Sequence, residues 1–151
     1  MAFQTTTLTS AEYETKTLET RVLEWTEQLC EALTENYKQH SIRMYQAGES
    51  DYSKKQLESV EDGTWKGMKF VIKNGRKYYK VMQHEFDTFR DRNEYRESSV
   101  HAFIDKKTGE VYKPASYNSP AQHVRYDLRI IREREMCFMK ADWAGGYLYM
   151  R

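Results

Sequence analysis

The dipeptide Asn74-Gly75, placed between two β-rich runs, constrains the fold more than any other feature of the sequence. Residues 68–73 alternate between an apolar set and a set that carries lysines, and residues 76–83 continue with β-favouring side chains. Asn-Gly is typical of a two-residue type I′ turn, because both turn positions require a positive φ. The sequence therefore predicts an antiparallel hairpin with one apolar face and one basic face.

A second hairpin is predicted within residues 99–113. A β-rich run is followed by the turn from Asp105 to Gly109, where Gly109 supplies the left-handed residue of a longer hairpin loop. Four strands in sequence order predict an antiparallel meander with one solvated face. Residues 84–97 are charged with interspersed aromatics, which fits either a wide, protruding loop or an extension of the strands.

A long amphipathic helix is predicted before the sheet. Thr9 and Glu12 have the spacing of a capping box, in which each side chain satisfies the backbone N–H of the other residue. Apolar residues then recur at steps of three and four until Gly48 ends the pattern. These apolar positions are Leu18, Val22, Trp25, Leu29, Ala32 and Leu33. The stripe either packs on the protein's own sheet or pairs with another helix.

Helix is also predicted after the sheet. Ser119 and Pro120 fit an N-cap and the first position of a helix. Residues 132–141 fit a further helical piece, and a short strand is expected at 147–150.

These elements together predict an α+β protein. It has a long N-terminal amphipathic helix, an antiparallel β-meander of about four strands and C-terminal helices. The polar residues 48–64 are predicted to be a loop with one helical turn around Leu57. The single domain 1–151 is expected to comprise a flexible start at 1–10, helix at 11–47, the meander at 65–115 and helix at 119–141.

Composition and charge narrow the functional classes. Two isolated cysteines, Cys30 and Cys137, favour buried thiols in a reducing compartment over a disulfide framework. No apolar run is long enough to span a bilayer, and the N-terminus does not resemble a signal peptide, so we expect a cytoplasmic protein without a membrane partner. Residues 1–62 hold 12 acids and 6 bases, whereas residues 63–151 hold 11 acids and 18 bases. The two parts either attract each other, within the fold or a dimer, or the basic part meets a polyanion.

Part of the chain resembles a known group of proteins. The pattern comprises Val100, His101, Phe103, Asp105, Thr108, Gly109, Val111, Tyr112, Lys113, Ala115, Ser116, Pro120 and Arg125. It is similar to a segment of short uncharacterised proteins from tailed phages of marine bacteria and cyanobacteria, a family found in ocean metagenomes. Tyr117, Asn118 and Gln122 depart from that pattern, where relatives have a Trp-Lys pair and a further lysine. The resemblance implies a phage or metagenomic origin and implies no activity.

Two groups of residues are candidate anion-binding sites. Two tyrosines lie among a run of bases along the first hairpin, and a basic strand face with aromatics is how a sheet binds single-stranded nucleic acid, although a solvated strand face has the same composition. This group comprises Lys69, Lys73, Arg76, Lys77, Lys80, Tyr78 and Tyr79. The second group lies around the predicted helix start and suits a phosphate, although its members also fit capping and ion-pairing roles. It comprises Lys113, Ser116, Ser119, His123 and Arg125.

No catalytic or metal-binding motif is present in the sequence. A pair of Cys137 and His123 can be drawn, but the flanking residues do not resemble a nucleophile site. We therefore expect no enzyme activity, metal or cofactor. The leading hypothesis is a phage-type accessory protein that binds a host or phage protein, or itself as a homodimer. The alternatives are a nucleic-acid-binding protein using strands 66–80 and a minor virion component. The expected location is the cytoplasm of the infected bacterial host, or the virion.

Overall fold

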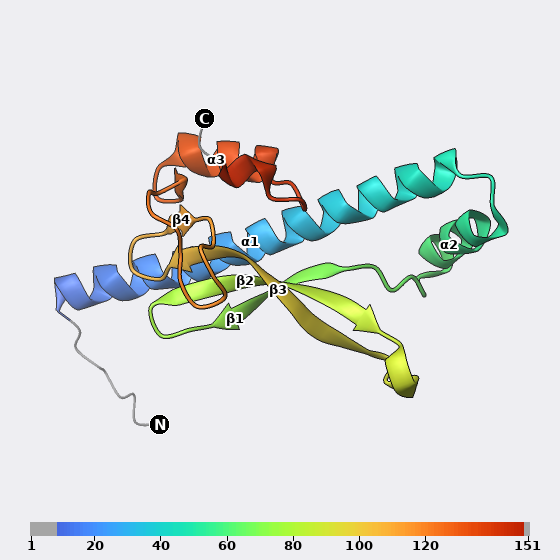
Figure 1. Cartoon of the computed structure of the whole chain (residues 1–151). Coiled ribbons are helices and arrows are strands. Elements are labelled where there is room, and N and C mark those ends of the chain that lie inside the picture. Colours follow the sequence, from blue (N-terminus) through green and yellow to red (C-terminus); the bar gives the residue numbers. More distant parts are fainter. Residues whose placement is uncertain (1–8, 150–151) are drawn as a thin grey trace, which may run out of the picture.

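The chain folds as a long helix crossed by an antiparallel sheet, with a short helix at the C-terminal end (Figure 1). This computed structural model describes residues 9–149. The elements are α1 (Ser10–Ala47), α2 (Asp51–Asp62), β1 (Lys69–Asn74), β2 (Tyr78–Asp87), β3 (Glu94–Asp105), β4 (Glu110–Tyr112), β5 (Tyr126–Asp127) and α3 (Ile131–Lys140). The predicted α+β class is confirmed, with five strands instead of about four.

Helix α1 begins and ends where the sequence predicts. Thr9 Oγ1 accepts a hydrogen bond from the Glu12 N–H at 3.2 Å, and Glu12 Oε2 accepts one from the Thr9 N–H at 3.0 Å. Val22, Leu29 and Leu33 are fully buried, because the apolar stripe lies against β1 and β2. The stripe therefore packs on the protein's own sheet.

The sheet buries apolar residues on both faces. Its order is β1-β2-β3-β4-β5, and every neighbouring pair is antiparallel. The face toward α1 contributes Phe70, Val81 and Ile104 to the main core. On the opposite face, Met82 and Phe103 are also fully buried. The second face is therefore partly covered, whereas a meander with one solvated face was predicted.

The first hairpin has the predicted strands but a different turn. Neither Asn74 nor Gly75 has a positive φ, so the type I′ prediction is wrong. Asn74 pairs with Tyr79, and the Gly75 N–H donates to the Tyr78 carbonyl at 3.0 Å. The register thus requires a longer loop than two residues. Glycine is still needed at 75, because a Cβ there would lie 2.7 Å from the Tyr78 carbonyl oxygen.

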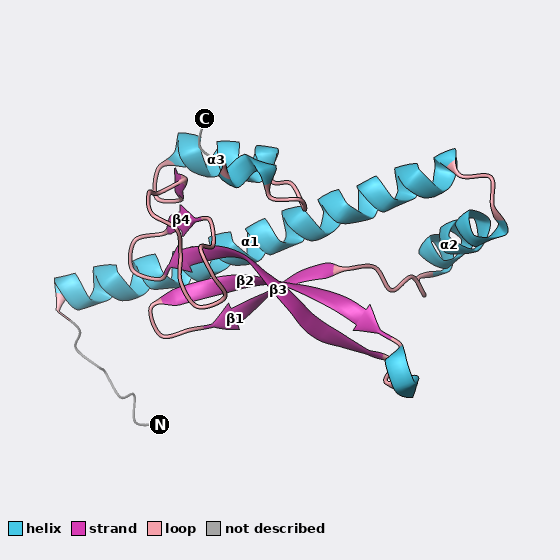
Figure 2. Cartoon of the chain, in the orientation of Figure 1, coloured by secondary structure: helices cyan, strands magenta, loops and turns pink. Residues whose placement is uncertain are grey.

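Residues 84–97 extend the strands. The pairing of β1 with β2 stops at His84, whereas β2 and β3 stay paired as far as Asp87 and Glu94. These two strands therefore continue as a two-stranded ribbon beyond the rest of the sheet (Figure 2). We call residues 85–96 the projecting ribbon.

The segment 48–64 was predicted to be a loop and is mostly helix. Ser50 caps α2 by accepting a hydrogen bond from the Ser53 N–H at 3.2 Å, and Gly63 ends it with φ +81°. Tyr52 meets Tyr45 of α1 edge to face, with ring centroids 6.3 Å apart. This helix has few apolar residues, and its end caps and its contacts with α1 stabilise it.

The predicted helix over 119–141 is wrong for its first part. The backbone of residues 121–128 pairs with β4 instead: the N–H groups of Ala121, Arg125 and Leu128 donate to the carbonyls of Lys113, Val111 and Gly109 at 2.7–2.9 Å. The open edge of β4 offers these bonds, and they replace the bonds of a helix. The piece predicted at 132–141 is confirmed as α3.

The predictions for the two chain ends are tested only in part by the described residues. The expected strand at 147–150 is instead a 3₁₀ turn at Gly146–Leu148, and its last residue lies outside the described residues. Most of the segment expected to be flexible, 1–10, also lies outside them. Within residues 9–149, no helix is long and apolar enough to cross a membrane.

Candidate functional site

The lysines on the outer face of the first hairpin are engaged by neighbouring side chains. Lys73 and Lys80 lie opposite each other on β1 and β2. Lys73 Nζ lies 3.2 Å from a Glu97 carboxylate oxygen and donates to the Tyr117 hydroxyl at 2.8 Å. The hydrogen bond to the Tyr117 hydroxyl, together with the one to the Glu97 carboxylate, raises the pKa of Lys73.

Lys80 is held by the segment that covers this face. Its Nζ donates to the Tyr117 carbonyl at 2.9 Å and to the Asn118 side chain at 3.3 Å. The same Nζ lies 4.4 Å from the Tyr117 ring centroid and 5.5 Å from that of Phe103. Lys80 therefore lies partly beneath Tyr117, and the predicted outward basic face is interrupted there.

The remaining members of the first candidate group separate in space. Lys69 Nζ lies 3.9 Å from the ring centroid of Tyr95 on β3. Tyr78 packs edge to face on Phe103, on the same side of the sheet as Lys80. Tyr79 is turned to the opposite face, where it packs against the main core. The tyrosines therefore do not form one stacking surface.

Arg76 and Lys77 join bases that the sequence did not place with them. Both are exposed in the turn between β1 and β2, beside Lys106 and Lys107 of the turn between β3 and β4. The Lys106 N–H donates to the Lys77 carbonyl at 3.1 Å, which fixes one turn against the other. We call these four residues the basic turn cluster.

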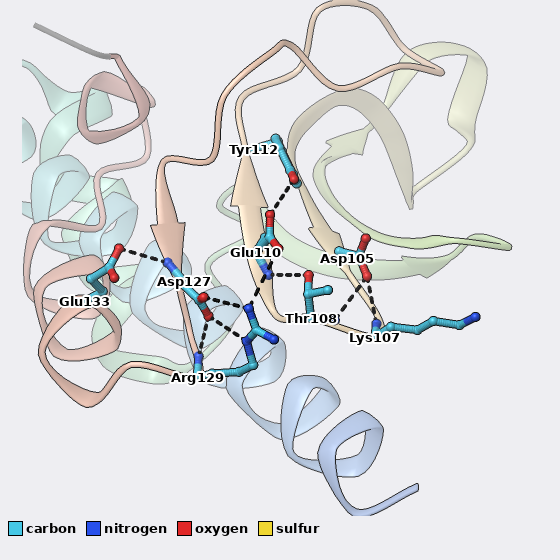
Figure 3. A network of polar contacts seen from close by, with 8 residues as sticks. All are labelled: Asp105, Lys107, Thr108, Glu110, Tyr112, Asp127, Arg129 and Glu133. Carbon is cyan, nitrogen blue, oxygen red and sulfur yellow. Dashed lines mark hydrogen bonds and ion pairs between the residues drawn. The ribbon is translucent and has the colours of Figure 1, made fainter. Parts of the chain in front are cut away.

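A network of polar contacts holds the second of these turns (Figure 3). The buried Asp105 carboxylate accepts hydrogen bonds from the N–H groups of Lys107 and Thr108 at 2.8 and 3.1 Å. Beside the turn, Arg129 makes two side-chain hydrogen bonds to Asp127, at 3.1 and 2.9 Å, and these bonds lower the pKa of the Asp127 carboxyl. Figure 3 shows the Lys107 side chain pointing away from this network.

The second candidate group does not surround a helix start, because residues 119–130 are not helical. Arg125 instead donates its guanidinium hydrogens to the carbonyls of Gln122, His123 and Leu148. Lys113 Nζ lies 4.5 Å from the ring centroid of Tyr149.

The two serines of this group shape the covering loop. The carbonyl of Ser119 accepts hydrogen bonds from the N–H groups of Ala115 and Ser116, at 2.9 and 3.1 Å. The predicted phosphate site relied on a helix N-terminus at Ser119, and this prediction is wrong because the segment is not helical. Ser116 and Ser119 instead close the loop.

The tip of the projecting ribbon has an unusual backbone and an exposed aromatic ring. Phe89 is 63% exposed, in a short 3₁₀ turn between β2 and β3. Arg90, Asp91 and Asn93 all have positive φ, between 46° and 59°. Asp and Asn tolerate this conformation, whereas Arg seldom adopts it. The sequence interpretation of 84–97 did not single out any of these residues.

His101 is enclosed by the C-terminal segment. Its Nε2 lies 2.9 Å from the Tyr147 hydroxyl, and the Phe70 ring packs edge to face against it. Burial lowers the pKa of His101 to about 4, and the charge of Asp142 acts in the opposite direction. His101 is therefore a buried, neutral histidine.

Cys137 and His123 lie in different environments. Cys137 is fully buried, and burial raises the pKa of its thiol to about 12. His123 is exposed on a loop with φ +74°. In the described part of the chain, no group of three or more His, Cys, Asp or Glu residues is placed to hold a metal ion.

Fold and site together define an α+β protein in which an antiparallel meander on a long helix carries a basic cluster at one end and a projecting ribbon at the other. The chain belongs to a family described as a family of unknown function (DUF7717), whose family model matches residues 6–150. A search of curated proteins and a search of solved structures gave no match.

Proposed function

We propose that this protein is a phage-type accessory protein that acts by binding a host or phage protein in the cytoplasm of the infected bacterial host. The observation that carries the proposal is the exposed Phe89 ring on the preorganised tip of the projecting ribbon. Aromatic side chains dominate the binding energy of many protein interfaces, because they bury a large area when a partner covers them.

The tip is held in shape before any partner arrives. One Asp87 carboxylate oxygen accepts a hydrogen bond from the Phe89 N–H at 2.8 Å. The other lies 3.4 Å from Arg92 Nη1 and 3.3 Å from Arg96 Nη1. A fixed loop loses less conformational entropy on binding than a flexible one, so this arrangement favours recognition.

The left-handed backbone at Arg90 supports the same conclusion. Such a conformation costs roughly 1–2 kcal/mol in a residue with a Cβ, and it persists where surrounding contacts hold it. Here the Arg90 guanidinium lies 5.2 Å from the Phe89 ring centroid, so the strained residue flanks the exposed ring. Strain of this kind clusters at binding sites, where a side chain must be presented in one orientation.

The test is affinity capture from cells infected by the phage that encodes the chain, followed by mass spectrometry. The Phe89→Ala variant is captured in parallel with Tyr52→Ala, a matched control whose aromatic ring is 65% exposed on α2. We expect a specific protein that is retained by the wild type and by Tyr52→Ala and is lost with Phe89→Ala. Equal capture by all three chains would contradict a role for the ribbon.

The identity of the captured protein separates the forms of this hypothesis. A host protein or a non-structural phage protein supports an accessory role in the cytoplasm, and a capsid or tail protein supports a minor virion component. Recovery of the chain itself supports a homodimer, which sedimentation of purified wild type and Phe89→Ala protein would test directly.

A further inference from the structure

Two turns that are far apart in the sequence meet at one end of the sheet. Arg76 and Lys77 come from the first turn, and Lys106 and Lys107 come from the second. With Tyr79 and Glu19 they line an open pocket of about 480 Å³. This size falls within the range of pockets that bind small molecules, roughly 300–1,000 Å³.

Among the residues that the structure describes, the four bases of this cluster have no ion-pair partner. Across residues 9–149, the ion pairs of the chain involve Lys73, Arg92, Arg96 and Arg129, and none involves the basic turn cluster. Lys77 and Lys106 lie 5.2 and 4.9 Å from the ring centroids of Tyr78 and Tyr79. A ring face orients an ammonium group but leaves its charge in place.

The backbone holds these like charges together. The Lys106 N–H bond to the Lys77 carbonyl joins the turns, and the buried Asp105 carboxylate fixes the second turn from within. One carboxylate, that of Glu19, lines the same pocket, so bases outnumber acids there by four to one. A cluster that is fixed, unpaired and mostly exposed attracts an anion with several charges.

We propose that the basic turn cluster is a binding site for a ligand with two or more consecutive phosphate groups. Guanidinium and ammonium groups are the usual protein partners of phosphate oxygens. Two turns, each with a pair of bases, suit a ligand that spans both. A nucleic-acid strand and a free polyphosphate share this chemistry.

The site is separate from the proposed protein-binding tip. The cluster lies at the start of β2 and the tip follows its end, ten residues along the strand. At the rise of an extended strand, this places them about 30 Å apart. One chain can therefore hold an anionic ligand and a protein partner at the same time.

The experiment measures binding at low salt by equilibrium titration of the full chain. The probes are a short single-stranded DNA, ATP and inorganic tripolyphosphate. Lys106→Gln/Lys107→Gln removes two bases of the cluster. Lys54→Gln/Lys55→Gln is the matched control, because it removes two exposed bases of α2, at the far end of α1 (Figure 1).

We expect the cluster variant to lose at least tenfold in affinity and the control to stay within twofold of the wild type. For single-stranded DNA, four phosphate contacts predict a slope of log K against log salt of about −2.8, which falls to about −1.4 in the cluster variant. Glu19→Gln should raise the affinity for every probe that binds, because it removes the opposing carboxylate.

Each outcome decides the proposal. Binding of DNA alone identifies a nucleic-acid strand as the ligand. If tripolyphosphate binds with the same affinity as DNA, the phosphate groups suffice and the ligand is a free polyphosphate. Binding of ATP alone identifies a nucleotide. Failure of all three probes at low salt overturns the proposal, as does an equal loss of affinity in the cluster and control variants.

Discussion

His101 should contribute to the destabilisation of this protein by acid. In the folded chain burial lowers its pKa from 6.5 to about 4. The unfolded chain therefore binds a proton as the pH falls through about 6.5, whereas the folded chain binds it only near pH 4. The stabilising contribution is fully present above the unfolded pKa and is lost as the pH falls toward the folded pKa.

The size of this effect follows from the two pKa values. Each pKa unit corresponds to about 1.4 kcal/mol, so the contribution of His101 amounts to about 3 kcal/mol. The side chain is 5% exposed and is packed by Phe70 and Tyr147. Asp142 is the charged group that favours the protonated form, and its effect is already included in the lowered pKa.

Urea unfolding between about pH 7 and about pH 4 would measure this contribution. The wild type should lose about 3 kcal/mol more free energy of unfolding over this range than His101→Gln, which cannot take up the proton. His123→Gln is the control and should behave as the wild type, because His123 is exposed. Parallel pH profiles for the wild type and His101→Gln would refute the argument from burial.

Three further predictions concern the core and the turns. Phe103→Ala should lower the free energy of unfolding by about 3–5 kcal/mol in urea, because the ring is fully buried, and a loss below 1 kcal/mol would contradict a packed second face. Gly75→Ala should destabilise the hairpin, because its Cβ would lie 2.7 Å from the Tyr78 carbonyl oxygen; an unchanged melting temperature would count against this close contact. Cys30 and Cys137 should resist a thiol reagent in the native protein and react on unfolding, since burial raises both pKa values to about 12. Rapid labelling of the native chain would show that the thiols are accessible.

Helix α1 and the strands of the two hairpins could be predicted because their signals are local. The capping box joins residues three apart, and the alternation of Met68, Phe70 and Ile72 is read along one strand. The turn at Asn74-Gly75 was located correctly but its type was wrong. The register between β1 and β2 sets the length of that turn, and this register depends on packing against α1.

The segment 119–130 shows the limit of local signals. Ser119 and Pro120 fit a helix start, yet the open edge of β4 offers hydrogen bonds to a chain that lies beside it. Backbone groups take the partners that the tertiary structure supplies, and here those partners, at Lys113, Val111 and Gly109, lie farther back in the sequence than the turn of a helix reaches.

The candidate site, too, could be predicted from the sequence only in part. The sequence alone determined that bases and tyrosines concentrate in the first hairpin, because composition and alternation are properties of the chain itself. Only the tertiary structure decided which of these charges remain free. Lys73 forms an ion pair with Glu97, and Lys80 donates a hydrogen bond to Tyr117, both from distant segments. Arg76 and Lys77 instead lie beside the bases of the turn between β3 and β4. Electrostatic interaction depends on distance in space, and folding sets that distance.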